Sequence, residues 1–180
     1  RQELPIIKQN FPTDLQSSET ADLFLALIMY RIKDNGKVGV ILPDGFLFGN
    51  DGAKLNIKKR MLKDFNLHTI IRLPGSIFSP YTSIATNILF FDKTGPTKKT
   101  WFYRLDMPKG YKHFSKTRPM KLEHFDPVRE WWNDRREIQD EDGNYKSKAY
   151  TPEELAKNNY NFDLCGFPTE TEEVLSLIHI

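Results

Sequence analysis

Apolar residues cluster in three short runs in the first half of the chain, and the connections between the runs differ. Residues 38–42 lack polar alternation and end at Pro43, which is typical of a central strand covered on both faces. Residues 68–73 follow after a helical stretch, whereas residues 84–91 follow after only a short loop. A helical crossover joins parallel strands, and a short loop reverses the chain. The pattern therefore predicts an α/β sheet with two parallel strands and a reversed third strand.

The loops after the two parallel strands are where function is expected, because α/β enzymes bind their ligands at the carboxyl ends of strands. Asp44 directly follows the first strand, but an aspartate in Pro43-Asp44-Gly45 is more often a turn residue than a catalytic one. Thr86 and Asn87 either orient the loop before the reversed strand or only complete the strand ladder. The residues predicted at this cleft edge are Pro43, Asp44, Gly45, Phe46, Thr86 and Asn87.

The loop after Leu73 is too rich in proline and glycine for regular structure, yet it carries large apolar side chains. Ile77, Phe78 and Tyr81 favour a shaped wall beside a cleft. The competing interpretation is equally open: Ile77 and Phe78 are core residues, each stabilising the fold by about 1.5–3 kcal/mol through burial.

Two helices are predicted around the first strand. One begins near Ser17, whose hydroxyl can cap free amides, and ends at Gly36. Its circumference is largely apolar, so both of its sides are expected to be covered. The second covers about 53–65, with Asn50 or Asp51 as the cap, and places its apolar residues toward the sheet. Its basic residues are expected on the solvated surface rather than against a phosphate; they are Lys54, Lys58, Arg60 and Lys63.

The sequence changes character after a further predicted strand at 100–105. We therefore expect two regions, an α/β region at residues 1–105 and a basic, aromatic and helical extension at 106–180. A helix is predicted from Pro127 that carries Trp131, Trp132 and Ile138 and is broken at 140–143. Its tryptophans suit docking on the α/β body or contact with a partner. A second, short helix begins at the capping box that starts at Thr151.

Composition limits the choice of function without deciding it. The 180 residues are 39% hydrophobic, which is enough for one domain with a core, and the net charge of +2 does not by itself indicate nucleic acid. The four histidines and single cysteine lack the spacing of a metal site, so no metal is expected. Cys165 is expected to be a small buried residue rather than a reactive thiol. No apolar stretch is long enough for a membrane span, and a cytoplasmic protein is predicted.

Several longer stretches carry a resemblance to a known family. They are residues 18–24 (SETADLF), 39–48 (GVILPDGFLF), 67–74 (LHTIIRLP), 77–80 (IFSP), 86–91 (TNILFF), 101–105 (WFYRL) and 158–163 (NNYNFD). From about residue 15 to 164 the chain resembles the carboxyl-side half of the catalytic domain of type I restriction-modification modification subunits, which are adenine-N6 DNA methyltransferases. The resemblance implies a class I S-adenosylmethionine-dependent methyltransferase fold, Rossmann-like and truncated to its carboxyl-side strands and helices, with a helical extension.

Two motifs of that family do not occur in this sequence. One is the glycine-rich loop that holds the methionine end of S-adenosylmethionine, and the other is the Asn-Pro-Pro-aromatic tetrapeptide that grips the target amino group. Asn10-Phe11-Pro12 does not replace the tetrapeptide, because it lacks the paired prolines. The chain also begins at Arg1 without a methionine, so it is interpreted as a fragment that is inactive alone. Residues 175–180 match nothing in the family and look like a junction or a truncation scar.

The resemblance also assigns roles to residues that are present. Phe78 matches the aromatic residue that helps to hold the flipped adenine, with Tyr81 as the second choice and Pro80 beside them. The composition of residues 109–121, basic and aromatic, separately suits phosphate contacts, although a solvated extension is the commoner explanation. The candidate phosphate-contacting residues are Lys112, Lys116 and Arg118. The implied partners are double-stranded DNA and the specificity and restriction subunits of the same system.

Two alternative functions remain open from the sequence. One is another class I methyltransferase that acts on RNA or protein. Sequence upstream of Arg1 would distinguish it from the DNA enzyme by the presence or absence of the Asn-Pro-Pro-aromatic tetrapeptide. The other is a DNA-binding or partner-binding module without enzymatic activity, for which the discriminator is whether the chain folds as a soluble monomer.

Overall fold

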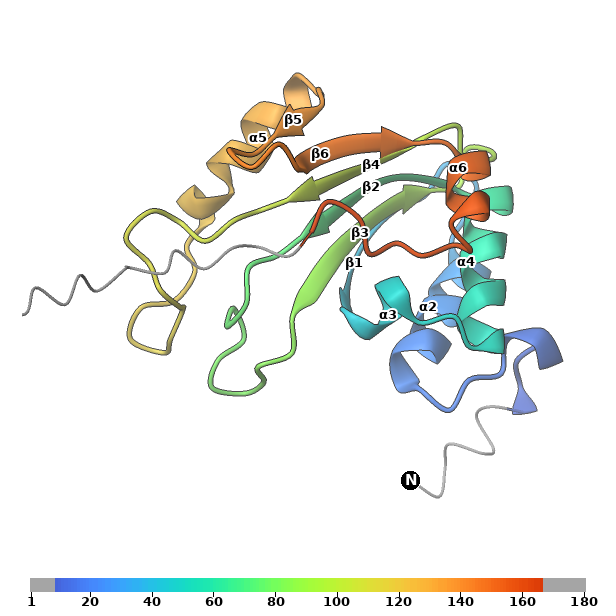
Figure 1. Cartoon of the computed structure of the whole chain (residues 1–180). Coiled ribbons are helices and arrows are strands. Elements are labelled where there is room, and N and C mark those ends of the chain that lie inside the picture. Colours follow the sequence, from blue (N-terminus) through green and yellow to red (C-terminus); the bar gives the residue numbers. More distant parts are fainter. Residues whose placement is uncertain (1–8, 167–180) are drawn as a thin grey trace, which may run out of the picture.

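The computed structural model describes residues 9–166, so the apolar tail at 175–180 lies outside the described residues. Its centre is a mixed sheet with the strand order β1-β3-β2-β4-β6-β5 (Figure 1). The strands are β1 (Lys37–Pro43), β2 (Asn66–Arg72), β3 (Thr86–Asp92), β4 (Thr100–Arg104), β5 (Ile138–Gln139) and β6 (Tyr145–Tyr150).

Helices cover the two faces of the sheet unequally (Figure 1). On one face α2, α4 and α6 contribute to a core that includes Ile70, Leu89 and Phe102 of the sheet. On the other face α5 packs over Ile71 and Tyr103. The helical elements are η1 (Thr13–Leu15), α2 (Thr20–Arg31), α3 (Gly45–Phe48), α4 (Gly52–Asp64), η2 (Leu122–Phe125), α5 (Asp126–Asn133) and α6 (Pro152–Lys157).

The predicted reversal of the third strand is confirmed. β3 runs antiparallel to both β1 and β2, so β1 and β2 point in the same direction although β3 lies between them. β4 then extends the sheet parallel to β2. The loops that follow β1, β2 and β4 therefore meet at one edge of the sheet.

The prediction that the first strand is covered on both faces is wrong for the described residues. β1 lies at the edge of the sheet and pairs with β3 alone among the described strands. Its residues alternate between more and less exposed, and Ile41 keeps 51% of its surface accessible. The sequence of β1 is as apolar as that of a central strand, but no described strand pairs with its outer edge.

The start of α2 differs from the prediction in its capping. Glu19 occupies the cap position without a side-chain cap bond. The Ser17 hydroxyl accepts a hydrogen bond from the free Glu19 amide at 3.0 Å, as predicted, and donates to the Asp22 carboxylate at 2.7 Å. The cap of α4 is one of the two residues predicted, because the Asp51 carboxylate accepts a hydrogen bond from the Lys54 amide at 3.1 Å. The capping box that begins at Thr151 is confirmed at the start of α6.

The prediction that the lysines of α4 lie on a solvated face is wrong for Lys54 and Lys58, which are both buried. The Lys54 amine lies 2.6 Å from the Glu19 carboxylate and 3.1 Å from that of Asp22, so it pairs α4 with α2. Periodicity shows which face of a helix is apolar, but it does not show that a neighbouring helix carries the acidic partners of its lysines.

The region after α5 contains two strands that the sequence pattern did not predict. Ile138 belongs to β5 rather than to the helix, and residues 140–143 form the turn of the hairpin between β5 and β6. β6 pairs with β4 and so extends the sheet. Its polar sequence, Tyr145 to Tyr150, contains too few apolar residues to resemble a strand. Trp131 docks on the sheet, with its ring centroid 4.7 Å from that of Tyr103.

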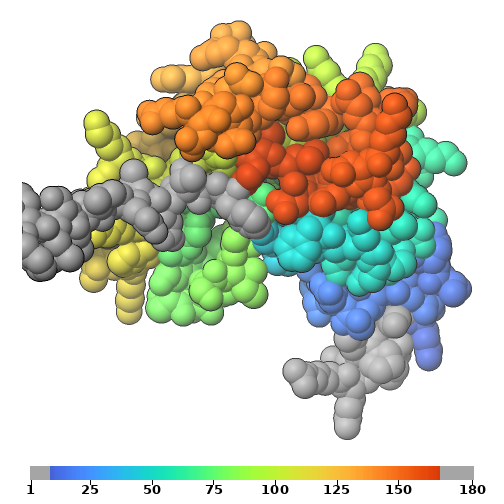
Figure 2. Space-filling view, in the orientation of Figure 1, coloured from blue at the N-terminus to red at the C-terminus, as the bar shows by residue number. Residues whose placement is uncertain are grey.

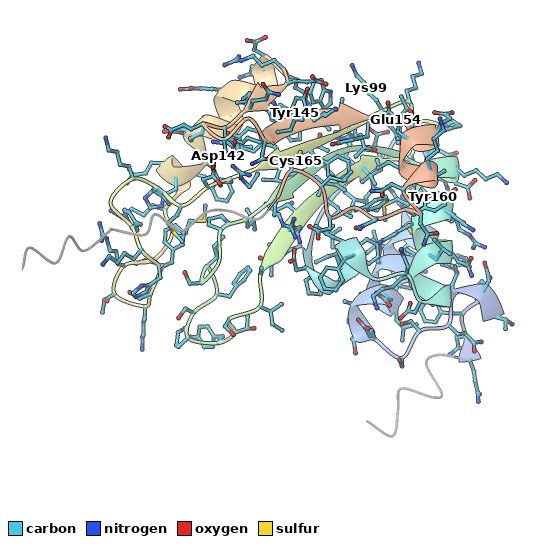
Figure 3. All side chains as sticks on the ribbon, viewed as in Figure 1. Lys99, Asp142, Tyr145, Glu154, Tyr160 and Cys165 are labelled. Atoms are coloured by element: carbon cyan, nitrogen blue, oxygen red, sulfur yellow. The ribbon has the colours of Figure 1, made fainter. Side chains whose placement is uncertain are left out.

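After α6 the chain crosses the sheet in a segment without helix or strand, residues 158–166, which we name the strap. It runs from Tyr160 near α6 to Cys165 over the strands (Figure 3). Phe162 is fully buried in the core, and its amide donates to the carbonyl oxygen of Leu47 in α3 at 2.8 Å. The strap therefore connects the end of the described chain to the segment that follows β1.

Candidate functional site

Asp44 lies at the carboxyl end of β1 and is more than a turn residue. Its side chain is buried, and its carboxylate accepts two hydrogen bonds from the Arg72 guanidinium, at 2.9 and 3.0 Å. It accepts a third from the Asn87 side-chain amide at 3.0 Å. The interpretation of Asp44 as a turn residue missed these bonds, because the sequence does not show that β3 lies between β1 and β2.

Arg72 and Arg104 form a buried basic row at the same edge of the sheet. They face each other in the parallel register of β2 and β4. Arg72 donates to the Asp163 carboxylate at 2.5 Å and to the carbonyl oxygen of Gly166 at 3.1 Å. Arg104 donates to the Cys165 carbonyl oxygen at 3.0 Å. The sheet therefore holds the strap by its polar groups at the carboxyl ends of two strands.

The loop between β2 and β3, residues 73–85, projects from the body of the protein (green in Figure 2). Phe78 keeps 38% of its surface accessible and Tyr81 keeps 90%, and Pro80 is exposed as well. Ile77 instead packs against the core under α5. The core interpretation named Ile77 and Phe78. Ile77 packs against the core as that interpretation expects, whereas Phe78 is partly exposed.

The other predicted cleft-edge residues have varied positions. Pro43 pairs with Thr86 at the end of the β1–β3 ladder, and the Thr86 carbonyl oxygen accepts a hydrogen bond from the amide of Leu73. Gly45 begins α3. Phe46 is buried in the core, so its ring does not line the edge.

The basic segment, residues 109–121, lies beside the β2–β3 loop. The amide of Phe114 donates to the Ser76 hydroxyl at 2.8 Å, and the Phe114 ring is buried. Lys112, Lys116 and Arg118 are all exposed, and the Arg118 guanidinium stacks 3.7 Å from the centroid of the Tyr111 ring. The three predicted phosphate-contacting residues are thus on the surface, next to the loop that carries Phe78.

Lys58 is a fully buried cation, although the sequence pattern predicted it on the surface. Its amine donates to three carbonyl oxygens, those of Leu47 at 2.7 Å, Gly49 at 2.9 Å and Tyr160 at 3.1 Å. Burial lowers its pKa to about 8, from 10.5. The lysine therefore joins α4 to the segment after β1 and to the strap. A run of basic residues in an amphipathic helix gave no signal that Lys54 and Lys58 are buried.

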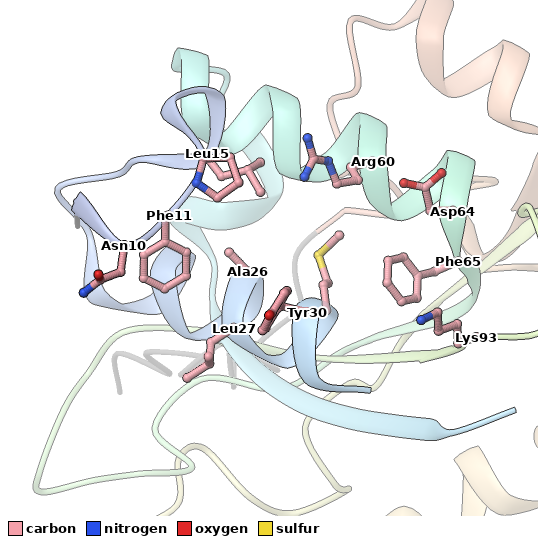
Figure 4. Close-up of a pocket in the computed structure, with 12 residues that line it drawn as sticks. Asn10, Phe11, Leu15, Ala26, Leu27, Tyr30, Arg60, Asp64, Phe65 and Lys93 are labelled. Carbon is pink, nitrogen blue, oxygen red and sulfur yellow. The ribbon is translucent and has the colours of Figure 1, made fainter. Parts of the chain in front are cut away.

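A large apolar cavity of about 990 Å³ lies on the opposite side of the chain from these strand ends, between η1, α2 and α4 (Figure 4). Phe11, Leu27, Tyr30 and Phe65 are among its walls. None of the predicted cleft-edge or loop residues lines it, so this cavity is not part of the candidate site.

The chemistry of the described residues restricts what the site can hold. Residues 9–166 contain no cluster of three or more His, Cys, Asp or Glu side chains that suits a metal ion. Cys165 has a pKa raised to about 11 by burial, so its thiol is not activated. No helix among the described residues is long and apolar enough to cross a membrane.

S-adenosylmethionine is the cofactor that the resemblance implies, and the described residues do not form a complete site for it. Arg72 engages the carboxylates of Asp44, at the end of β1, and of Asp163, in the strap, so neither is directed at a ligand hydroxyl. The segment after β1 contains Gly45, Gly49 and Gly52, but Gly45 and Gly52 begin the helices α3 and α4.

Comparison with known proteins places the chain in a family. The sequence profile of the N-6 DNA Methylase family matches residues 6–174, and the chain belongs to this family. Its mixed α/β structure is that of the modification subunits of type I restriction-modification systems.

Individual relatives are similar over most of this chain. The EcoEI methylase subunit of a type I restriction enzyme from Escherichia coli is 46% identical over 159 residues, covering 88% of this chain and 32% of the relative. A modification subunit of a putative type I restriction enzyme from Vibrio vulnificus YJ016 has a TM-score of 0.74 at 42% identity, covering 82% of this chain and 31% of that one. A structure of a type I restriction-modification system has a TM-score of 0.76 at 36% identity, covering 94% of this chain and 36% of that one. The chain thus spans about a third of the length of these relatives.

Proposed function

We propose that the chain is the carboxyl-side part of the catalytic domain of a site-specific, S-adenosylmethionine-dependent adenine-N6 DNA methyltransferase, the modification subunit of a type I restriction-modification system. The single observation that carries this proposal is the exposed aromatic loop before the reversed strand β3, in a chain of the N-6 DNA Methylase family. The similarity to methylase subunits over most of the chain supports it.

In this proposal the β2–β3 loop holds the target base. An adenine amino group inside a duplex is out of reach, so the base must leave the stack at a cost of a few kcal/mol. Stacking on an aromatic side chain contributes about 1–3 kcal/mol for a base, which offsets much of that cost. Phe78 is the first candidate for the stacking ring, Tyr81 is the second, and Pro80 lies between them in the same loop.

The basic segment is proposed to contact the DNA backbone next to the flipped base. Lys112, Lys116 and Arg118 are exposed, and the segment is fastened to the base-holding loop through the bond between Phe114 and Ser76. Phosphate contacts of this kind position a protein on a duplex without reading its sequence. The choice of recognition site would then rest with a specificity subunit.

The proposed partners are double-stranded DNA and the specificity and restriction subunits of the same system, in the cytoplasm. The relatives are methylase subunits of type I restriction enzymes, which supports this assembly.

The test is methyl transfer by a full-length subunit that contains this chain, purified together with its specificity subunit. Radiolabelled methyl groups from S-adenosylmethionine should enter double-stranded DNA, and digestion of that DNA should yield N6-methyladenine. Label in RNA or protein instead of DNA would favour the alternative methyltransferase. Absence of transfer to any of them, with DNA binding retained, would indicate a binding module.

A further inference from the structure

The β2–β3 loop begins and ends within one buried network of hydrogen bonds centred on Asp44. Arg72 is the last residue of β2, and Asn87 is the second residue of β3. The two are direct partners in the antiparallel register, so they form the two feet of the loop. Both donate to the Asp44 carboxylate, Arg72 at 2.9 and 3.0 Å and Asn87 at 3.0 Å.

The main chain of Asp44 adds another bond to the same loop. Its amide donates to the carbonyl oxygen of Ala85, the last residue of the loop, at 2.9 Å. Asp44 therefore binds Arg72 before the loop, Ala85 at its end and Asn87 in the strand that follows. Phe78 lies between these fixed points, so its position depends on how they are held.

The network suits positioning rather than contact with a ligand. Asp44, Arg72 and Asn87 are all buried, and the carboxylate bonds from Arg72 are charge-assisted, which makes them roughly twice as strong as neutral ones. The Asp163 carboxylate of the strap binds the other side of the Arg72 guanidinium at 2.5 Å. Arg72 would thus keep a carboxylate partner if the charge of Asp44 were removed, so that change need not unfold the protein.

We propose that Asp44 is a positioning residue for the β2–β3 loop: it fixes both feet of the loop, and thereby the orientation of Phe78 toward the target base. This inference rests on the proposed function for its consequence, whereas the clamp itself rests on the hydrogen bonds alone.

The experiment compares the full-length subunit, in complex with its specificity subunit, with its Asp44→Asn variant. Asparagine keeps one oxygen for the site where Arg72 and Asn87 both donate, but it removes the charge and replaces the second acceptor of Arg72 by an N–H donor. The clamp is therefore weakened at nearly constant volume. Methylation turnover should fall about 10-fold to 100-fold, because a misplaced group near the reacting atom costs that much. The dissociation constant for S-adenosylmethionine should change by less than about threefold, since Asp44 is not a donor-site residue.

Two further readouts separate positioning from folding. A duplex with 2-aminopurine in place of the target adenine, its site first located by sequencing methylated DNA, should show a smaller fluorescence rise with the variant. Amide hydrogen exchange should increase in residues 74–85 and remain unchanged in α4. Asn87→Ser, which loses the amide donor to Asp44, should show the same changes more weakly. Asp14→Asn is the matched control, because Asp14 pairs with Arg60 at 2.9 Å on an exposed surface.

The possible outcomes decide between the interpretations. Wild-type turnover and loop exchange in Asp44→Asn would overturn the proposal, as would equal losses of turnover and cofactor binding in both clamp variants. If the wild-type complex transfers no methyl group to DNA, the proposed function fails. The exchange measurement still tests the clamp in that case, because it needs neither cofactor nor substrate.

Discussion

Lys58 shows how one side chain can hold three segments together. A protonated lysine amine has three N–H donors, and Lys58 directs them to the carbonyl oxygens of Leu47, Gly49 and Tyr160. Its pKa of about 8 leaves it protonated at neutral pH. Burying this charge is costly, but the three acceptors and the nearby Phe162 ring, 4.9 Å from the amine, offset the cost.

Replacing Lys58 by methionine should destabilise the protein, because the substitution leaves buried carbonyl oxygens without a donor. Each unsatisfied carbonyl group costs about 1–3 kcal/mol. Because methionine is uncharged, the variant no longer has the cost of burying an ammonium group, which offsets part of this loss. We therefore expect a net decrease in the free energy of unfolding of about 2–4 kcal/mol. Urea unfolding at pH 7 measures it. Lys63→Met, at an exposed position of the same helix, is the control and should change stability by less than about 0.5 kcal/mol.

The same lysine predicts a pH dependence with a defined sign. Its pKa is about 8 in the folded protein and 10.5 in the unfolded chain, so the unfolded chain binds more protons between these two pH values. The unfolding free energy of the wild type should therefore rise from pH 8 toward pH 10.5, by at most about 1.4 kcal/mol per pH unit from this group. Lys58→Met should lack this contribution. Parallel pH profiles of the two proteins would contradict the assignment.

Phe78 is the residue for which the two sequence interpretations, core and base-holding wall, make opposite predictions. Its partial exposure favours the wall. Phe78→Ala in the full-length enzyme should reduce methyl incorporation much more than the affinity for S-adenosylmethionine, by roughly 10-fold if about 1–3 kcal/mol of stacking is lost. Both quantities should be measured on one preparation. Equal losses, or a collapse in thermal stability, would assign Phe78 to the core.

At the scale of elements, the sequence predicted the strands that are apolar and missed those that are not. The runs at 38–42, 68–73 and 84–91 identified β1, β2 and β3 to within about two residues, because a buried strand must be apolar. β6 is polar and its pairing with β4 is a tertiary interaction, which local pattern does not show. The residues predicted at the cleft edge end β1, follow it or begin β3, but the hydrogen bonds between them depend on strand order, which the motifs do not show.

Residues far apart in the sequence make up the features that were missed. Asp44, Arg72 and Asp163 belong to three different segments, and their association follows from the sheet register and the path of the strap. Each residue alone has an ordinary local explanation: a turn, a strand end and a polar loop. The network became visible only once the fold brought the three together.

The basic segment is an element whose role can be measured through salt. If Lys112, Lys116 and Arg118 contact phosphates, their joint replacement by glutamine should lower the slope of log affinity against log salt by about one unit per lost contact. Binding of a short duplex by the full-length complex, measured from low to physiological salt, gives the slope. Joint replacement of Lys63, Lys98 and Lys99, which are exposed on other elements, is the control. An unchanged slope would return the segment to the solvated surface.

At the scale of the whole molecule, apolar surface gathers around α2 and the edge strand β1. Phe24, Tyr30 and Ile41 are all more than half exposed. The apolar helix was predicted to be covered on both sides; α4 contacts it, but Phe24, Leu27 and Tyr30 remain exposed. An apolar face beside an unpaired strand edge favours association with another polypeptide surface, or aggregation if none is present.

This surface leads to the expectation that the 180-residue chain alone neither binds S-adenosylmethionine nor methylates DNA. The family's glycine-rich loop and Asn-Pro-Pro-aromatic tetrapeptide do not occur in its sequence, and the carboxylates of Asp44 and Asp163 are already paired with Arg72. One wall of a cleft has little affinity for a cofactor, because a binding site must bury most of the ligand's surface. Calorimetric titration with S-adenosylmethionine tests this directly, before and after addition of a separately expressed segment that carries both motifs. Binding that emerges only after mixing would support complementation across the α2 and β1 surface, whereas micromolar affinity of the chain alone would show that the donor site is complete within it.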